Sequence, residues 1–212
     1  MGLGSEDLGS VVGVPDPLSL SQVILSGSTP VSLSGVVYKT LDFPCNSLML
    51  SGVGRDPAKL KYIDNGAGSG GAYLYQFQNA VTDELQFCFK MPREWKQGTN
   101  VIPYVIWAPD NNSALDAVFR IEHAVQKTGA AFTVTNLGAE EPVAASGVPN
   151  QVQRSLLTPL SMVGMDLDSI IIGRILRVGA SAADTFTGNC WMFNFGFIYQ
   201  VDTVGSSGTI TK

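Results

Sequence analysis

The amino-acid sequence predicts an all-β protein, an antiparallel, jelly-roll-like β-sandwich with an extended N-terminal arm. Apolar and polar residues alternate with a period of two in several short segments, which is typical of half-buried strands. The 212 residues include 23 glycines and 11 prolines, so turns are frequent. No segment longer than one turn shows helical spacing of its apolar residues. We predict an arm at 1–35, a sandwich at 36–205 and a tail at 206–212, and this length can bury a sizeable core.

The strongest strand signal lies near the C-terminus. Turn-forming residues occupy 184–188, and a Gly/Ser-rich stretch follows Asp202. Between them, one alternating set of positions is apolar: Trp191, Phe193, Phe195, Phe197, Tyr199 and Val201. We therefore predict a strand that turns this whole set toward the core.

The N-terminal third is harder to assign. Residues 1–35 are rich in Ser, Gly and Pro with scattered Val and Leu, which indicates an arm that docks either on a neighbouring subunit or on its own domain. Short apolar runs at 36–39 and 45–50 predict two strands. Asp56 followed by Pro57 is typical of a helix start, so 56–62 is compatible with a single helical turn.

The middle of the chain predicts a meander of antiparallel strands. The expected strands are Tyr73–Phe77, Leu85–Met91, Val101–Trp107 and Ala117–Val125. After them we expect a short strand at 132–134, a long loop at 136–151, and strands at 156–160 and 169–178. The last is β-branched on both faces, which predicts a strand buried on both sides or at an interface.

The composition limits the classes of function. Only 15% of residues are charged, the net charge is -5 and basic residues do not cluster, so nucleic acid is not an expected partner. No apolar run reaches the ~18 residues of a membrane span, and the N-terminus lacks a signal-peptide pattern, so synthesis in a cytoplasm is expected. Few charges and a mean hydropathy of +0.17 favour a protein covered by copies or partners. The three cysteines, Cys45, Cys88 and Cys190, are predicted to be reduced thiols.

Catalytic patterns are weak. His123 is the only histidine and lies in a predicted strand, so a histidine-rich zinc site cannot form within one chain, and a strand histidine is favoured over a catalytic base. Two carboxylate pairs, 83–84 and 140–141, are adjacent in sequence, which in a strand places them on opposite faces and in a loop usually leaves both solvated. Residues 110–112 and 166–168 could offer oxygen ligands to calcium, but without the spacing of a known loop. We therefore expect no enzyme activity, cofactor or metal.

Trp95 and Trp107 adjoin polar loops. Either could stack on a sugar ring, as tryptophans of sandwich lectins do, or pack in the core or at an interface. The sequence alone leaves both interpretations open.

Four blocks of the sequence resemble a family of tailed-bacteriophage structural proteins. They are AVTDELQF at 80–87, MPREWKQG at 91–98, the strand at 103–109 and the segment 184–205. The resemblance implies a place in the virion and no established activity. Members carry histidines in the third block, where this chain has Tyr104 and Ile106, so no metal or catalytic role is carried over. At the level of fold the chain is also similar to jelly-roll cement proteins on phage capsids.

The sequence-based hypothesis is a capsid decoration (cement) protein on the outside of a virion, which stabilises the assembled shell by bridging capsomers. The expected partners are the major capsid protein and further copies of the chain, as a homodimer or homotrimer, with no membrane or nucleic acid. The alternative is a receptor- or carbohydrate-binding module of a tail or head fibre. The predicted contact residues are Val11, Val12, Val14, Val23, Ile24 and Leu25 in the arm and the loop residues Arg93, Trp95 and Asp110.

Overall fold

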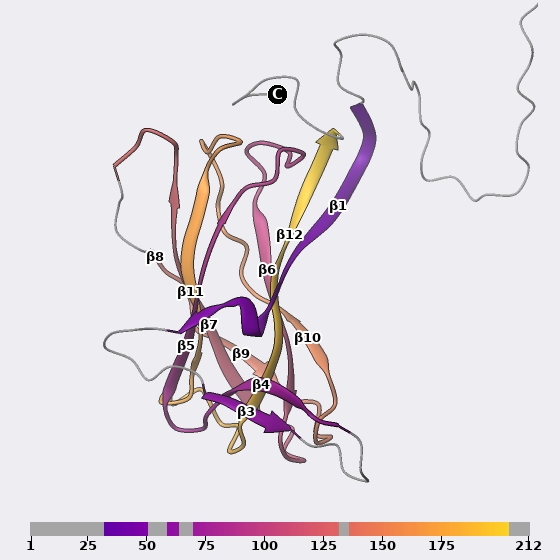
Figure 1. Cartoon of the computed structure of the whole chain (residues 1–212), viewed down its shortest axis with the longest axis vertical. Helices are drawn as coiled ribbons and strands as arrows, with labels where there is room; N and C mark the ends of the chain where they lie inside the picture. The colour runs from indigo at the N-terminus through magenta and orange to yellow at the C-terminus, as the bar shows by residue number, and fades with distance from the viewer. Residues whose placement is uncertain (1–31, 51–58, 64–69, 132–135, 204–212) are drawn as a thin grey trace, which may run out of the picture.

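The computed structural model describes residues 32–50, 59–63, 70–131 and 136–203, which form two antiparallel β-sheets packed face to face (Figure 1). The strands are β1 (Ser32–Pro44), β2 (Met49–Leu50), β3 (Lys59–Ile63), β4 (Ala72–Phe77), β5 (Thr82–Lys90), β6 (Val101–Pro109), β7 (Asp116–Gln126), β8 (Asn136–Leu137), β9 (Glu141–Ala144), β10 (Gln153–Leu156), β11 (Ile170–Val178) and β12 (Cys190–Thr203). A 3-10 turn, η1 (Cys45–Ser47), separates β1 from β2.

The order of the strands confirms the jelly-roll-like sandwich. The first sheet runs β10-β6-β12-β4-β3, with β1 also paired to β12. The second runs β2-β5-β11-β7, with β8 and β9 both paired to β7. Strands β4 to β7 therefore alternate between the sheets, and the predicted meander is wrong. Local alternation shows that each segment is a strand, but it does not show which sheet the strand joins.

The last strand, β12, contains a β-bulge that the alternation pattern did not reveal. Met192 pairs with Trp107 and Asn194 pairs with Ile106, so Phe193 is an extra residue and the facing of side chains reverses there. The predicted facing of the side chains is correct for residues that follow the bulge and wrong for residues that precede it. The residues of β12 in the core are Cys190, Met192, Phe195, Phe197, Tyr199 and Val201. Trp191 lies on the other face, with the Lys61 ammonium 5.9 Å from its ring centroid.

The two sheets meet through aromatic side chains. Phe87 of β5 packs against Phe195 of β12, with ring centroids 4.8 Å apart. Phe89 packs against Phe197 in the same way, with ring centroids 4.6 Å apart. Such pairs contribute about 0.5–1.5 kcal/mol each beyond the area they bury. This aromatic layer fixes how the second sheet lies on the first.

Three further predictions change. Lys59–Ile63 is strand β3, so the predicted helical turn is wrong there, while 51–58 lie outside the described residues. The predicted loop at 136–151 contains β8 and β9. The strand predicted at 156–160 lies earlier, as β10. The prediction for β11 is confirmed, because it pairs with β5 on one side and β7 on the other and buries residues on both faces.

A buried arginine closes the turn before β12. The Arg177 side chain is fully buried and pairs with the equally buried Asp184. Its guanidinium also donates to the backbone carbonyl oxygens of Phe77, Phe186 and Gly188, so all five of its N–H groups have acceptors. Asp184 Oδ2 additionally accepts from the Val118 N–H at 2.9 Å. The predicted turn at 184–188 is thus held by hydrogen bonds from a buried side chain.

Candidate functional site

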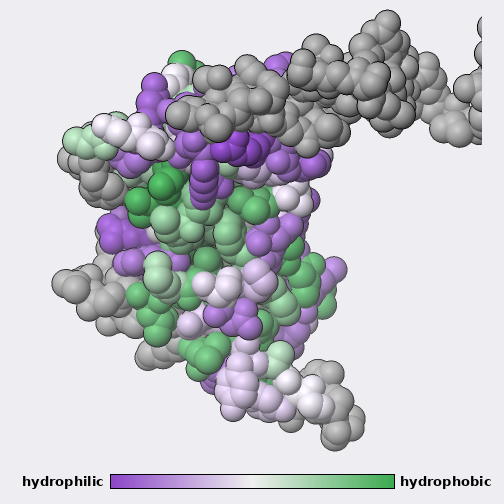
Figure 2. Space-filling model, turned by 45° about the horizontal axis from the view of Figure 1, so that its top comes forward, coloured by the Kyte–Doolittle hydropathy of each residue, from purple (hydrophilic) through white to green (hydrophobic). Residues whose placement is uncertain are grey.

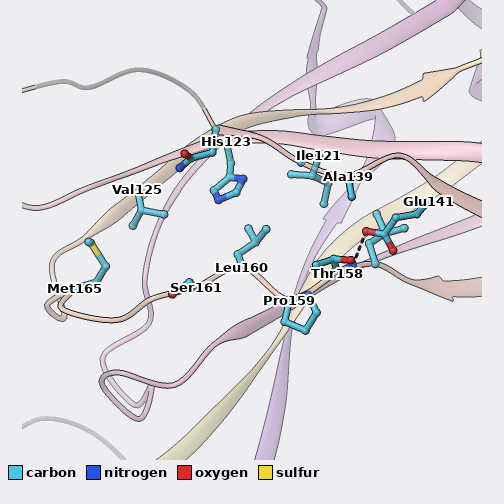
Figure 3. A pocket seen from close by; sticks show the side chains of 13 residues that line it. Ile121, His123, Val125, Ala139, Glu141, Thr158, Pro159, Leu160, Ser161 and Met165 are labelled. Atoms are coloured by element: carbon cyan, nitrogen blue, oxygen red, sulfur yellow. Dashed lines mark hydrogen bonds between the residues drawn. The ribbon is translucent and has the colours of Figure 1, made fainter. Parts of the chain in front are cut away.

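A pocket of about 400 Å³ opens between β7, the β8–β9 region and the segment that follows β10 (Figure 3). Its lining is mainly aliphatic, with a few polar groups. The lining residues are Ile121, His123, Val125, Asn136, Gly138, Ala139, Glu141, Leu157, Thr158, Pro159, Leu160, Ser161 and Met165. This mixture of an apolar wall and a few hydrogen-bonding groups is typical of ligand sites, and the volume is near the small end of their range.

The pocket lies between residues of β7 in the second sheet and the segment that follows β10 of the first sheet. β10 ends at Leu156, and the following segment keeps contact with the first sheet through Val101, whose backbone exchanges two hydrogen bonds with Leu160. Ile121 on β7 is part of the core, and His123 and Val125 continue the same face of that strand toward its end. Core-facing positions of β7 therefore become pocket walls.

His123 is a half-buried polar group in this wall. Its Nδ1 atom is buried and has no hydrogen-bond partner among the described residues. Burial removes water from the imidazole and so lowers its pKa below the ordinary 6.5. The ring is therefore neutral near pH 7, with one nitrogen able to donate and the other able to accept. In Figure 3 the ring points into the pocket.

Glu141 lies at the other end of the pocket, at the start of β9. Its Oε1 accepts the Thr158 N–H at 2.6 Å, which fixes the carboxylate and ties β9 to the segment after β10. The neighbouring Glu140 instead contacts Arg120 at 3.2 Å and the Ser181 hydroxyl at 2.6 Å. The two adjacent glutamates therefore have different partners, whereas the loop predicted at 136–151 would leave both solvated.

The tryptophans do not form a binding surface. Trp95 was predicted among the loop residues that contact a partner, but its side chain is 0% exposed, and its indole N–H donates to the Thr99 carbonyl and hydroxyl oxygens. Trp107 is also buried and donates to the Ser155 hydroxyl at 3.0 Å. Both have the core-packing role that the sequence left open.

The other predicted contact residues lie apart from the pocket lining. Arg93 is exposed and lies 3.7 Å from Asp168. Asp110 is half-buried and accepts from the backbone and side-chain amides of Asn189, which gives it a structural role. The arm residues Val11, Val12, Val14, Val23, Ile24 and Leu25 lie outside the described residues. Partner contacts by Arg93, Asp110 and the arm stay predictions.

The described residues do not gather a metal site. Within them, no group of three His, Cys, Asp or Glu side chains is placed to hold an ion. The two calcium candidates have other partners. In 110–112, Asp110 accepts from Asn189. In 166–168, Asp166 accepts from the Asp168 N–H and the Ser169 hydroxyl, and Asp168 pairs with Lys90. Nor does any helix in the described part of the chain have the length and apolarity to cross a membrane.

Sequence reasoning missed the pocket because no local motif encodes it. Its walls come from three segments, and aliphatic residues at strand ends look like core. One signal was available: His123 continues the core-facing register of Ile121, and such a histidine needs a partner or a ligand.

Comparison with known proteins gives distant structural likenesses. No family model matches the chain, and no curated protein matches it. Among solved structures, a family 35 carbohydrate-binding module from Clostridium thermocellum is 12% identical, with a TM-score of 0.46 over 75% of this chain and 97% of that one. The CBM36-1 domain of a xylanase from the hindgut metagenome of Trinervitermes trinervoides is 10% identical, with a TM-score of 0.41 over 75% and 96%. No function is transferred at these scores.

Proposed function

We propose that the protein is a non-enzymatic binding module that takes the end of a carbohydrate chain in the pocket between β7, β9 and the segment after β10. One observation supports it above the others: a mainly aliphatic pocket contains a buried histidine nitrogen without a partner among the described residues. Native structures pair nearly all buried polar atoms, so an unpaired one facing a cavity favours a ligand that completes it.

The chemistry of the lining suits a sugar. A pyranose presents C–H faces to aliphatic side chains and hydroxyl groups to polar ones. Ile121, Leu157 and Leu160 offer apolar contact, while His123 and Asn136 offer hydrogen bonds. Aliphatic side chains here take the place of the aromatic stacking surface that the sequence left open for the tryptophans.

The absence of catalysis is part of this proposal. Hydrolysis of a glycosidic bond ordinarily uses two carboxylates about 5–10 Å apart, one on each side of the bond. Among the described residues that line the pocket, Glu141 is the single carboxylate.

A blocking substitution tests the proposal. Thr158 lies exposed at the rim, so Thr158→Trp fills the entrance without removing a core side chain. Leu156→Trp is the matched control, because Leu156 is 56% exposed on β10 and lies outside the pocket. On a glycan array followed by calorimetry, wild type and Leu156→Trp should bind the same sugars and Thr158→Trp should lose them. Absence of sugar binding by the wild type would overturn the proposal.

A second candidate function is that of a virion decoration protein, and apolar side chains exposed on several strands support it. Val36 and Tyr38 on β1 are 63% and 57% exposed. On the β3–β4 pair, Tyr62 and Tyr73 are 45% and 63% exposed, with ring centroids 5.2 Å apart. Figure 2 shows hydrophobic groups gathered between hydrophilic ones on one face of the molecule. Exposed groups of this kind are typical of protein interfaces.

Co-sedimentation with mature phage shells that lack the protein tests this candidate. Full-length chain is compared with a chain that starts at Leu33, one residue after the start of β1. Saturation of the shell by the full-length chain at a fixed ratio supports it, and loss of binding on truncation assigns the contact to the arm. If neither form sediments with shells, the candidate fails.

A further inference from the structure

We infer that the pocket selects a sugar that carries a free amino group, which Glu141 binds, and that it rejects anionic sugars. This inference deepens the proposed function and rests on it.

Glu141 differs from the other described glutamates. Glu84 pairs with Arg174, Glu94 with Lys39, Glu122 with both Arg120 and Arg174, and Glu140 with Arg120. Within the described part of the chain, Glu141 alone has no lysine or arginine partner. Its Oε1 is occupied by the Thr158 N–H, which leaves Oε2 for a ligand.

The position of Glu141 makes this free charge useful. The residue is half-buried and lines the pocket beside aliphatic side chains. A cation brought by a ligand would form a charge-assisted hydrogen bond there, which is stronger than a neutral one. Because Thr158 already holds the carboxylate, little side-chain freedom is lost on binding.

Anionic ligands find no cationic side chain among the described residues that line the same pocket. No lysine or arginine is among its described lining residues, and Glu141 repels a negative charge. His123 does not compensate, because its buried imidazole is neutral. A neutral imidazole does not repel an ammonium group either, so it remains available to a hydroxyl of the same sugar.

Calorimetry on the full chain near neutral pH tests the inference, with glucosamine, glucose and glucuronate as probes. Wild type should bind glucosamine about tenfold more tightly than glucose, as one charge-assisted hydrogen bond allows, and should bind glucuronate more weakly than glucose. Glu141→Gln should remove the preference for glucosamine while it still binds glucose. Glu140→Gln is the matched control, one residue away but directed at Arg120, and should keep the preference.

The outcomes separate the inference from the proposed function. If none of the three probes binds, the inference fails, and the glycan array alone decides the proposed function. If sugars bind but glucosamine has no advantage, or keeps its advantage in Glu141→Gln, only the inference is overturned. Should Glu141→Gln fail to fold, the order of the three probes on the wild type decides alone: tighter binding of glucuronate than of glucosamine contradicts it.

Discussion

Two polar sites lie toward opposite ends of β7 and differ in how completely they are paired. Near the start of β7, Arg177 and Asp184 are fully buried, and every guanidinium N–H has an acceptor. Near its other end, His123 Nδ1 has no partner among the described residues. A buried polar group that is fully paired fixes a structure, whereas an unpaired one beside a cavity favours binding. The comparison therefore separates framework from candidate site.

The largest expected effect comes from breaking the paired site. Arg177→Met leaves Asp184 as an uncompensated buried charge and should lower the free energy of unfolding by about 3–5 kcal/mol. Urea denaturation measures this. The double variant Arg177→Met with Asp184→Leu should be more stable than the single one, because no charge remains buried. A loss below about 1 kcal/mol in the single variant would contradict the framework role.

Trp95 sharpens the comparison, because it is a second fully paired buried group. Trp95→Phe removes the indole N–H bond to Thr99 and part of the packed ring, and should cost about 1–3 kcal/mol of stability. Sugar affinity should not change, because Trp95 does not line the pocket. Thermal unfolding and calorimetry measure the two effects, and loss of sugar binding by a folded variant would return Trp95 to the binding surface.

The unpaired site should respond in the opposite direction. His123→Leu replaces a desolvated imidazole with an apolar side chain of similar size, and should raise the free energy of unfolding by up to about 1 kcal/mol while it weakens sugar binding. Denaturation and calorimetry on the same sample test both parts. A clear loss of stability would mean that the imidazole is part of the framework.

The smallest expected effect is a dependence of stability on pH. Because the pKa of His123 is lowered on folding, the unfolded chain binds the proton more readily, so its contribution is fully present above pH 6.5 and is lost as pH falls through the folded pKa. The slope cannot exceed about 1.4 kcal/mol per pH unit. Asp42, Glu94 and Asp168 have lowered pKa values and lose their contributions only below about pH 4.5. Between about pH 4.5 and pH 6.5, the free energy of unfolding should therefore depend less on pH in His123→Leu than in the wild type.

The sequence predicted the sandwich because its strands alternate clearly. The aromatic set at 195–201 was placed correctly, since those positions obey a period of two. Phe193 was not, because a bulge depends on pairing with β6, which no local pattern records. Short strands such as β8 and β9 follow from pairing with β7 rather than from their own composition.

The resemblance to phage structural proteins depends largely on residues that the fold buries. Leu85, Phe87, Trp95, Trp107 and Phe195 all lie in the core. Residues of this kind report how a chain packs, and they say little about what its surface binds. The residues of the candidate site, His123 and Glu141, fall outside the matched blocks, so sequence reasoning had no motif to connect them.

The most direct test of the central claim, that the pocket is a binding site completed by a ligand, uses the single histidine of the chain. Long-range ¹H–¹⁵N NMR spectra report the two imidazole nitrogens of His123 without any need for assignment. On titration with glucosamine, we predict a saturable shift of the His123 nitrogen resonances in the wild type and in Leu156→Trp, and none in Thr158→Trp. Unchanged imidazole resonances in the wild type, under conditions where calorimetry shows sugar bound, would place the binding site elsewhere and contradict the account.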